Sequence, residues 1–204
     1  MLNICTRNRS GLALIVAVVA WAAVPAAFAD QRPDVQRLFQ AGEYTEAVDA
    51  ARDADPASTY LAAQALMKLE QGDRAAAEFA RLRASGDPAW ALVGESGEAL
   101  LANNGARALE VARRAADAAG DNSWAQYQLG LSASKQSDWP TATRAFTRSI
   151  ELKNDFAYAH YYAALAFQRQ RQLSKTAEHF DAFLHLAPAA PEKQAVMAIM
   201  RTLR

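Results

Sequence analysis

Apolar residues recur along the chain with the period of amphipathic helices and not with the period of strands. After residue 30, apolar residues recur every three or four positions in segments of about 10 to 14 residues, and no alternating run of β-branched residues appears. Ala, Leu, Glu, Arg and Gln, all good helix formers, dominate these segments. Because helices this short are marginal alone in water, they must pack against one another. The pattern therefore predicts an all-α fold of stacked helices.

The same pattern returns at a fixed interval in the C-terminal half of the chain. Segment 137–155 aligns with segment 171–189, and Phe146 and Phe180 then stand at equivalent places, 34 positions apart. Segment 104–120 keeps this register one interval earlier, with alanines where the later segments carry larger residues. Repeats of this length are typical of helical solenoids, in which each unit buries its apolar face only against its neighbours.

The residues that recur in these units resemble the tetratricopeptide repeat (TPR) family, whose unit is a helix-turn-helix of 34 residues. The unit counted from 123 has Leu129 and Gly130 at positions 7 and 8, and Ala142 and Phe146 at positions 20 and 24. The unit counted from 157 fills positions 7, 8, 11, 24 and 32 with Ala163, Ala164, Phe167, Phe180 and Pro188. The resemblance implies a right-handed α-solenoid of about five such units followed by a C-terminal capping helix.

Toward the N-terminus the units shorten to about 30 residues, although each keeps a glycine, Gly42 or Gly72, at its turn. We expect these glycines to end one helix and to let the chain turn into the next. We also expect Asp138 to cap a helix that Pro140 opens. The array covers residues 30–190, with units near 33–56, 57–87, 88–122, 123–156 and 157–190.

The segment 191–204 after the fifth unit predicts one more amphipathic helix. It begins at Pro191, and one face carries Val196, Ile199, Met200 and Leu203. Such a helix would cover the exposed edge of the last unit, as solenoids require. The alternative is that this apolar face docks a second protein or a second subunit.

Residues 1–29 differ in kind from the rest and have the pattern of a signal peptide. Arg7 and Arg9 precede an uncharged apolar run, Pro25 breaks that run, and small residues lead to Ala29, after which we expect cleavage. The mature chain would then be exported, to the periplasm of a bacterium, without a stable membrane segment. The alternative is an uncleaved anchor in the inner membrane, with the helical array facing the periplasm.

Composition and charge narrow the possible functions. The 204 residues are 51% hydrophobic, enough for a buried core, and the 22 basic residues balance the 22 acidic ones. Because no basic stretch stands out, the sequence gives no sign of a nucleic-acid partner. The only cysteine, Cys5, lies in the segment expected to be removed, which excludes disulfide and thiol chemistry from the mature chain.

No motif of an enzyme or of a cofactor site is present. The sequence has no GxSxG elbow, P-loop, dinucleotide glycine fingerprint or haem-attachment motif. His160, His179 and His185 do not have the spacing of a metal site. We expect His160 to pack inside the array and the other two to be partly solvated. The sequence therefore predicts no catalytic residue, no cofactor and no metal.

Aromatic residues recur at positions that the resemblance places on the concave face of a TPR array. Position 2 of three successive units carries Trp90, Trp124 and Tyr158, position 5 carries Val93, Tyr127 and Tyr161, and position 9 of the last two carries Leu131 and Leu165. We expect these eight residues to form an exposed groove that binds a peptide or protein. The alternative is that a short array curls tightly and that neighbouring helices cover these rings.

The sequence thus predicts a non-catalytic scaffold for protein–protein interaction in the cell envelope. Trp139, Phe146, Phe167, Phe180 and Phe183 should instead pack between helices. Two alternatives stay open. The chain could be a structural assembly factor that associates with itself, or a membrane-anchored adaptor with an uncleaved N-terminal helix. The identity of the partner and the oligomeric state do not follow from the sequence.

Overall fold

The structure is a computed structural model that describes residues 34–203, which form eleven α-helices and no strand. The expected signal peptide over 1–29, its cleavage after Ala29 and the cysteine Cys5 lie outside the described residues. None of the helices in the described part is both long enough and apolar enough to cross a membrane. The fold class predicted from the sequence, an all-α solenoid, is confirmed.

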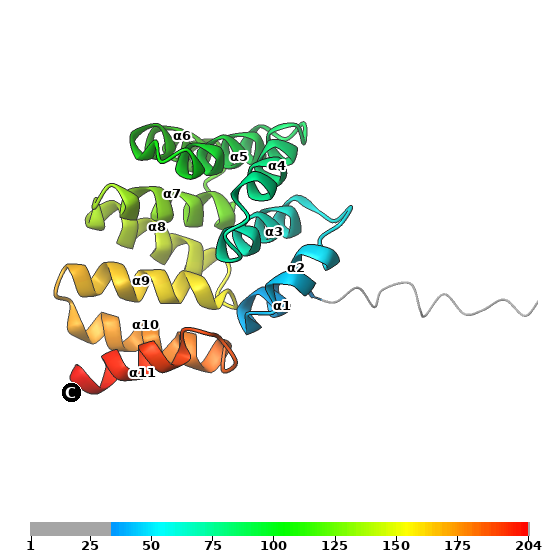
Figure 1. Cartoon of the computed structure of the whole chain (residues 1–204). Helices are drawn as coiled ribbons and strands as arrows, with labels where there is room; N and C mark the ends of the chain where they lie inside the picture. Colours follow the sequence, from blue (N-terminus) through cyan, green and yellow to red (C-terminus); the bar gives the residue numbers. More distant parts are fainter. Residues whose placement is uncertain (1–33, 204) are drawn as a thin grey trace, which may run out of the picture. The chain divides into compact units, whose positions relative to one another are not determined.

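Ten of the helices form five consecutive pairs, and the eleventh follows them (Figure 1). The pairs are α1 (Val35–Ala41) and α2 (Tyr44–Ala50), α3 (Pro56–Lys68) and α4 (Gly72–Arg83), α5 (Pro88–Leu101) and α6 (Gly105–Ala118), α7 (Ser123–Lys135) and α8 (Trp139–Leu152), and α9 (Ala157–Arg169) and α10 (Leu173–Leu186), followed by α11 (Lys193–Thr202). Each helix packs against the next one along the chain. The stack therefore grows by local contacts, as expected for a solenoid.

Polar side chains set where the helices begin. Asp55 and Asp87 each accept two backbone N–H bonds at the start of α3 and α5, directly before a proline. The predicted cap at Asp138 is confirmed, because its carboxylate accepts the backbone N–H of Thr141 at 3.2 Å. These caps satisfy N–H groups that have no partner inside the helix.

In four of the five pairs, one residue in the turn between the two helices has a left-handed backbone conformation. Glu70, Asn103, Ser137 and Arg171 adopt left-handed backbone with φ between 55° and 59°. Gly42 does the same with φ of 81° at the end of α1, as predicted. The prediction for Gly72 was wrong. Gly72 is the first residue of α4, and Glu70 takes the left-handed conformation instead.

Glycine is required where consecutive helices approach closely, both inside a unit and between adjacent units. A Cβ on Gly130 of α7 would lie 2.4 Å from Cε1 of Phe146 in α8, which no real contact allows. A Cβ on Gly97 of α5 would meet the ring of Phe79 in α4 at 2.3 Å. Both phenylalanines are fully buried. Large aromatic rings therefore fill spaces that the glycines leave open.

The residues expected to pack between helices are buried, except that Trp139 is buried only in part. Phe146, Phe180 and Phe183 are fully buried, and Phe167 is 5% exposed. Trp139 is only partly buried, and the guanidinium of Arg169 lies 5.6 Å from the centre of its ring.

The first helix pair contacts the end of the array. The turn at Gly42 touches Pro191 so closely that a Cβ there would lie 2.5 Å from the proline ring. Helix α11, which Pro191 precedes, packs on α10 and buries Val196 completely. Within the described part of the chain, the array therefore closes on itself.

Candidate functional site: the inner aromatic surface

The aromatic residues of α7 and α9 lie together on one side of the array. Trp124 and Tyr127 of α7 and Tyr158 of α9 surround Phe156, which directly precedes α9. The ring of Phe156 lies 4.7 Å from that of Trp124 and 5.0 Å from that of Tyr127, both edge-on. We call Trp124, Tyr127, Phe156 and Tyr158 the inner aromatic surface. Edge-on and tilted contacts of this kind are the favoured geometries of aromatic pairs.

Helix α1 covers one end of the inner aromatic surface. The ring of Phe39 lies 4.9 Å from that of Tyr158 and 6.4 Å from that of Phe156. Beside Phe39, the side chain of Gln40 accepts the backbone N–H of Ala157 at 2.6 Å. Helix α1 is thus held by an apolar ring and by a hydrogen bond to the backbone at the start of α9.

A second glutamine of α1 also bonds to backbone next to α9. The side-chain amide of Gln36 donates to the carbonyl of Asp155 at 3.0 Å. Phe39 of the same helix is only 2% exposed, and Gln40 is 9% exposed. Side chains of α1 therefore fill the space over the start of α9.

Helix α3 covers the other end of the inner aromatic surface through Tyr60. The ring of Tyr60 lies 5.7 Å from that of Trp124 and 6.3 Å from those of Tyr127 and Trp90. Its hydroxyl donates to the side-chain carbonyl of Gln128 at 2.7 Å. Burial raises the pKa of Tyr60 well above its ordinary value, so the hydroxyl is uncharged and available as a donor.

A buried chain of polar groups continues from Gln128. Its amide donates to the hydroxyl of Ser96 at 2.9 Å, and Ser96 lies 3.2 Å from the hydroxyl of Ser132. Ser96 also donates to the backbone carbonyl of Ala108 at the start of α6. All three side chains are fully buried. Because each of these polar groups has a hydrogen-bond partner, this row of hydrogen bonds links α3, α5, α6 and α7 and leaves no buried polar group unpaired.

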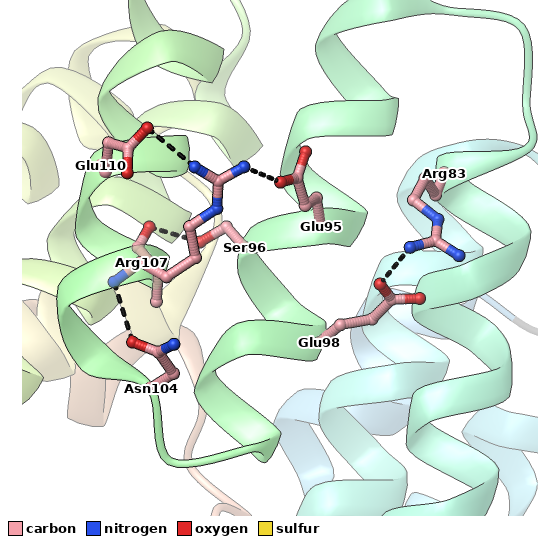
Figure 2. A network of polar contacts seen from close by, with 8 residues as sticks. Arg83, Glu95, Ser96, Glu98, Asn104, Arg107 and Glu110 are labelled. Carbon is pink, nitrogen blue, oxygen red and sulfur yellow. Dashed lines mark hydrogen bonds and ion pairs between the residues drawn. The ribbon is translucent and has the colours of Figure 1, made fainter.

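Partly exposed ion pairs join helices α4, α5 and α6. Figure 2 shows Arg107 of α6 between Glu95 of α5 and Glu110 of its own helix, at 2.5 and 2.8 Å. Arg83 of α4 pairs with Glu98 of α5 at 2.9 Å (Figure 2). These pairs are solvent-exposed, so each stabilises the fold only slightly. Between α5 and α6, the buried hydrogen bond from Ser96 to Ala108 is a link that solvent does not screen.

An ion pair and two tyrosines join the first units to the segment before α11. Lys68, at the end of α3, lies 2.7 Å from Glu192, and their side chains are 29% and 17% exposed. The hydroxyl of Tyr158 donates to the other carboxylate oxygen of Glu192 at 2.7 Å and lies 3.3 Å from the hydroxyl of Tyr44. We call Tyr44, Lys68, Tyr158 and Glu192 the closing cluster.

The charges of the closing cluster stabilise one another. Burial alone would raise the pKa of Glu192, but hydrogen bonds from Lys68 and Tyr158 outweigh burial and lower that pKa. Burial would likewise lower the pKa of Lys68, but the neighbouring Tyr162 and Glu192 raise it. The carboxylate and the ammonium are therefore both charged near neutral pH.

Four of the eight predicted groove residues are not exposed, and the expectation of an open groove is wrong for them. Val93 and Tyr158 are fully buried, Tyr127 is 2% exposed and Trp124 is 8% exposed. For the three aromatic residues, the physical reason is the tight curl of the array, which brings α1 and α3 onto the rings of α7 and α9.

The other four predicted groove residues, Trp90, Leu131, Tyr161 and Leu165, are partly buried and pack against the core. Their part in binding a partner stays a prediction.

Sequence reasoning missed Phe156 of the inner aromatic surface, the covering residues Phe39 and Tyr60, and Lys68 and Glu192 of the closing cluster. The signal for Phe39 is weak, because the N-terminal units are shorter than 34 residues and match the repeat less well than the later ones. Glu192 and Lys68 carried no local signal at all, since 124 positions separate them.

Two of the three histidines lie together, which the sequence did not predict. Nδ1 of His160 lies 3.1 Å from Nδ1 of His179, and the ring of His179 stacks on Phe167 with ring centres 5.4 Å apart. Burial lowers the pKa of both histidines, so both are neutral at neutral pH. Residues 34–203 contain no group of three or more His, Cys, Asp or Glu side chains that could hold a metal ion.

Comparison with known proteins identifies the fold. Neither a protein-family model nor a curated protein sequence matches the chain. Among solved structures, a thermophilic TPR protein of Thermus thermophilus, TTC0263, is 16% identical, with a TM-score of 0.59 over 83% of this chain and 94% of that one.

Two further solved structures are similar over less of the chain. YrrB, described as a TPR protein with an unusual peptide-binding site, is 19% identical, with a TM-score of 0.48 over 76% of this chain and 83% of that one. MamA of Desulfovibrio magneticus RS-1 is 23% identical, with a TM-score of 0.47 over 74% of this chain and 90% of that one. The likeness to TTC0263 shows that the chain has the TPR fold, which agrees with the resemblance seen in the sequence.

Proposed function

We propose that the chain is a non-catalytic scaffold of the bacterial cell envelope that binds a helical segment of a protein partner on its inner aromatic surface. One observation carries the proposal. Helix α1, from the opposite end of the array, occupies this surface through one aromatic ring and two glutamines. A bound peptide would use contacts of the same kind, with a buried anchor and hydrogen bonds to backbone groups.

Helix α1 is suited to leave this surface when a partner arrives. It has only seven residues, so it is not stable as a helix without the surface beneath it. A partner helix with an aromatic anchor can therefore take its place. The apparent affinity of the partner is reduced by the small fraction of molecules in which α1 is released.

The rest of the array supplies rigidity. The buried polar chain through Gln128 and Ser96 fixes α3, α5 and α7 relative to one another. Because the receiving side chains are already ordered, a partner loses little entropy in ordering them. Export of the chain is part of the proposal and is supported by the signal-peptide pattern of residues 1–29.

A removable crosslink tests the proposal. Gln36→Cys and Asp155→Cys, in a Cys5→Ser background, place one thiol on α1 and one before α9, where Gln36 and Asp155 are already hydrogen-bonded. A short, reducible crosslinker then holds α1 in place. Envelope proteins are captured by the crosslinked and by the reduced form of the same variant and compared by mass spectrometry. We expect proteins captured by the reduced form to be lost from the crosslinked form.

The matched control crosslinks the array at a place that does not involve α1. Arg83→Cys and Glu98→Cys stand at an exposed ion pair between α4 and α5. This crosslink should leave the captured proteins unchanged. If the crosslink at α1 also leaves them unchanged, the partner does not replace α1 and the proposal is wrong.

A second candidate function is self-association by exchange of α1 between two copies. The observation that favours it is the same docking contact, because α1 of one copy can occupy the surface of another as well as its own. Mixing a chain that carries only the Gln36→Cys thiol with one that carries only the Asp155→Cys thiol tests this candidate. A crosslinked dimer would support exchange, and its absence at high concentration would exclude it.

A further inference from the structure

Two surface hollows adjoin on the face formed by the second helices of the last three units. The first, of about 450 Å³, lies between α6, α7 and α8 and is lined by Arg113, Arg144 and Arg148. The second, of about 350 Å³, lies between α8, α9 and α10, and its charged lining residues are Arg144, Arg148, Lys175 and Glu151. Because Arg144 and Arg148 line both, the two hollows adjoin, and we call them together the basic trough.

The basic trough carries more positive than negative charge. Arg113 pairs with Asp138 at 3.2 Å, and Arg148 pairs with Glu151 at 3.0 Å. Arg144 donates to the hydroxyl of Thr141. Within residues 34–203, neither Arg144 nor Lys175 has a carboxylate at ion-pair distance. The whole sequence has 22 basic and 22 acidic residues, so this accumulation of cations is local.

The two ion pairs in the trough do not block it. The side chains of Arg113 and Asp138 are 53% and 31% exposed, and those of Arg148 and Glu151 are 48% and 56% exposed. Exposed pairs of this kind are weak and exchange partners readily. An incoming carboxylate can therefore bind these arginines as well as the unpaired ones, with two parallel hydrogen bonds to a guanidinium.

Apolar side chains lie among the cations of the trough. Leu129 and Ala145 line the first hollow, and Phe167 lines the second. The ammonium of Lys175 lies 4.9 Å from the centre of the Phe167 ring. A ligand that fits this surface has carboxylates with apolar groups between them. Both hollows are open to solvent, so the side chains of a peptide can reach these residues.

We propose that the basic trough binds an acidic peptide segment of a partner protein, in which glutamate or aspartate side chains alternate with apolar ones. The four cations receive its carboxylates, and the partly exposed Leu129 with the exposed edge of Phe167 contacts its apolar groups. A peptide is favoured over an anionic membrane because the cations surround hollows that admit side chains, whereas a lipid surface is flat. This site is separate from the inner aromatic surface, so its test does not depend on the function proposed for that surface.

Fluorescence anisotropy with a defined probe tests the proposal. The probe is a fluorescein-labelled peptide of the repeat Glu-Glu-Leu, and the same peptide with glutamine in place of glutamate is the control probe. The acidic probe should bind the full-length protein, and the glutamine probe should not. Arg144→Gln with Lys175→Gln removes the two unpaired cations and should weaken binding about tenfold at low salt. Because the interaction is between exposed charges, raising the salt to about 0.5 M should weaken it further.

A variant of equal net charge serves as the matched control. Arg52→Gln with Arg83→Gln removes two exposed cations outside the trough, whose side chains are 75% and 58% exposed. It should bind the acidic probe within about twofold of the wild type. Equal weakening in both double variants, or no binding of the acidic probe, would overturn the proposal. The proposal would also be overturned if the acidic probe does not bind while phosphatidylglycerol vesicles do, and the trough substitutions weaken the binding to vesicles.

Discussion

The ring of Phe39 lies 4.9 Å from the ring of Tyr158, although the two residues are 119 positions apart in the chain. This contact places a helix from the first unit on a side chain of the fifth. An open solenoid has no such contact, because each unit touches only its neighbours. The inner aromatic surface is therefore buried by the chain itself, and release of α1 is the simplest way to expose it.

Truncation of Phe39 should weaken this closure. Phe39→Ala removes a ring that is 2% exposed and should lower the free energy of unfolding by about 3 to 5 kcal/mol. It should also loosen Phe156, which lies 6.4 Å from Phe39 and 4.7 Å from Trp124, and so open access to Trp124, which is 8% exposed in the closed form. Acrylamide quenching of tryptophan fluorescence, measured under native conditions, reports that access and should increase.

Phe167→Ala is the matched control for Phe39→Ala. Phe167 is also buried, but its ring stacks on His179 away from the inner aromatic surface. The control should lower stability and leave quenching unchanged. Equal quenching in Phe39→Ala and the wild type would show that α1 does not shield Trp124.

The closing cluster makes part of the stability depend on pH. Hydrogen bonds from Lys68 and Tyr158 keep the pKa of Glu192 below its ordinary value in the folded state. At pH values between the pKa of Glu192 in the folded state and its pKa in the unfolded state, the unfolded state binds more protons than the folded state. The contribution of this carboxylate is therefore present above its unfolded pKa and is lost as the pH falls through the folded pKa.

Glu192→Gln should accordingly be less stable than the wild type at neutral pH, and the difference should shrink as the pH falls to about 3. Urea denaturation at a series of pH values measures this difference. Glu46→Gln, which removes an exposed carboxylate from α2, is the control. A difference for Glu192→Gln that stays constant from neutral to acidic pH would contradict the assignment.

The repeat and the helices could be predicted from the sequence because they rest on local signals. Gly130 and Phe146 stand 16 positions apart in one unit, and a close approach of the two helices requires both. Asp138 was predicted as a cap from its place before Pro140, and the cap is present. Contacts within a unit are encoded within that unit, so a single repeat already shows them.

Whether the aromatic residues are buried or exposed could not be predicted from the sequence. Tyr158 occupies a position that faces the open side of a TPR array, and the repeat pattern cannot say how tightly five units curl. Its burial depends on Phe39 and Glu192, which belong to the two ends of the array. The sequence left groove exposure and covering by neighbouring helices open, and for Val93, Trp124, Tyr127 and Tyr158 the second alternative is correct.

The left-handed residue at the turn between α3 and α4 offers a stabilising substitution. Glu70 has φ of 59°, a conformation that costs a residue with a Cβ about 1 to 2 kcal/mol. Glycine avoids this cost but loses more backbone entropy on folding, so Glu70→Gly should raise the free energy of unfolding by about 0.5 to 1 kcal/mol. Glu178→Gly, inside α10, should lower it by about 1 kcal/mol. If chemical denaturation shows that both variants are destabilised, the turn is not strained at Glu70.

The contact between Gly130 and Phe146 should make even a methyl group destabilising. Alanine favours a helix over glycine by about 1 kcal/mol, so Gly130→Ala would stabilise α7 if there were room. There is none, because the new Cβ would lie 2.4 Å from the Phe146 ring, and Tyr127 and Tyr162 hold that ring at 5.7 and 5.9 Å. Overpacking should cost about 1 to 3 kcal/mol, measured by chemical denaturation.

Two further variants separate overpacking from any other effect of the alanine. Gly72→Ala, whose Cβ would meet nothing within 4 Å at the start of α4, should be stabilising by about 0.4 to 1 kcal/mol. Phe146→Leu removes the aromatic ring edge that the methyl group meets. Gly130→Ala should therefore cost less in the Phe146→Leu background than in the wild type, which gives a favourable coupling energy in a double-mutant cycle. An additive cycle would show that the cost of Gly130→Ala does not come from the ring of Phe146.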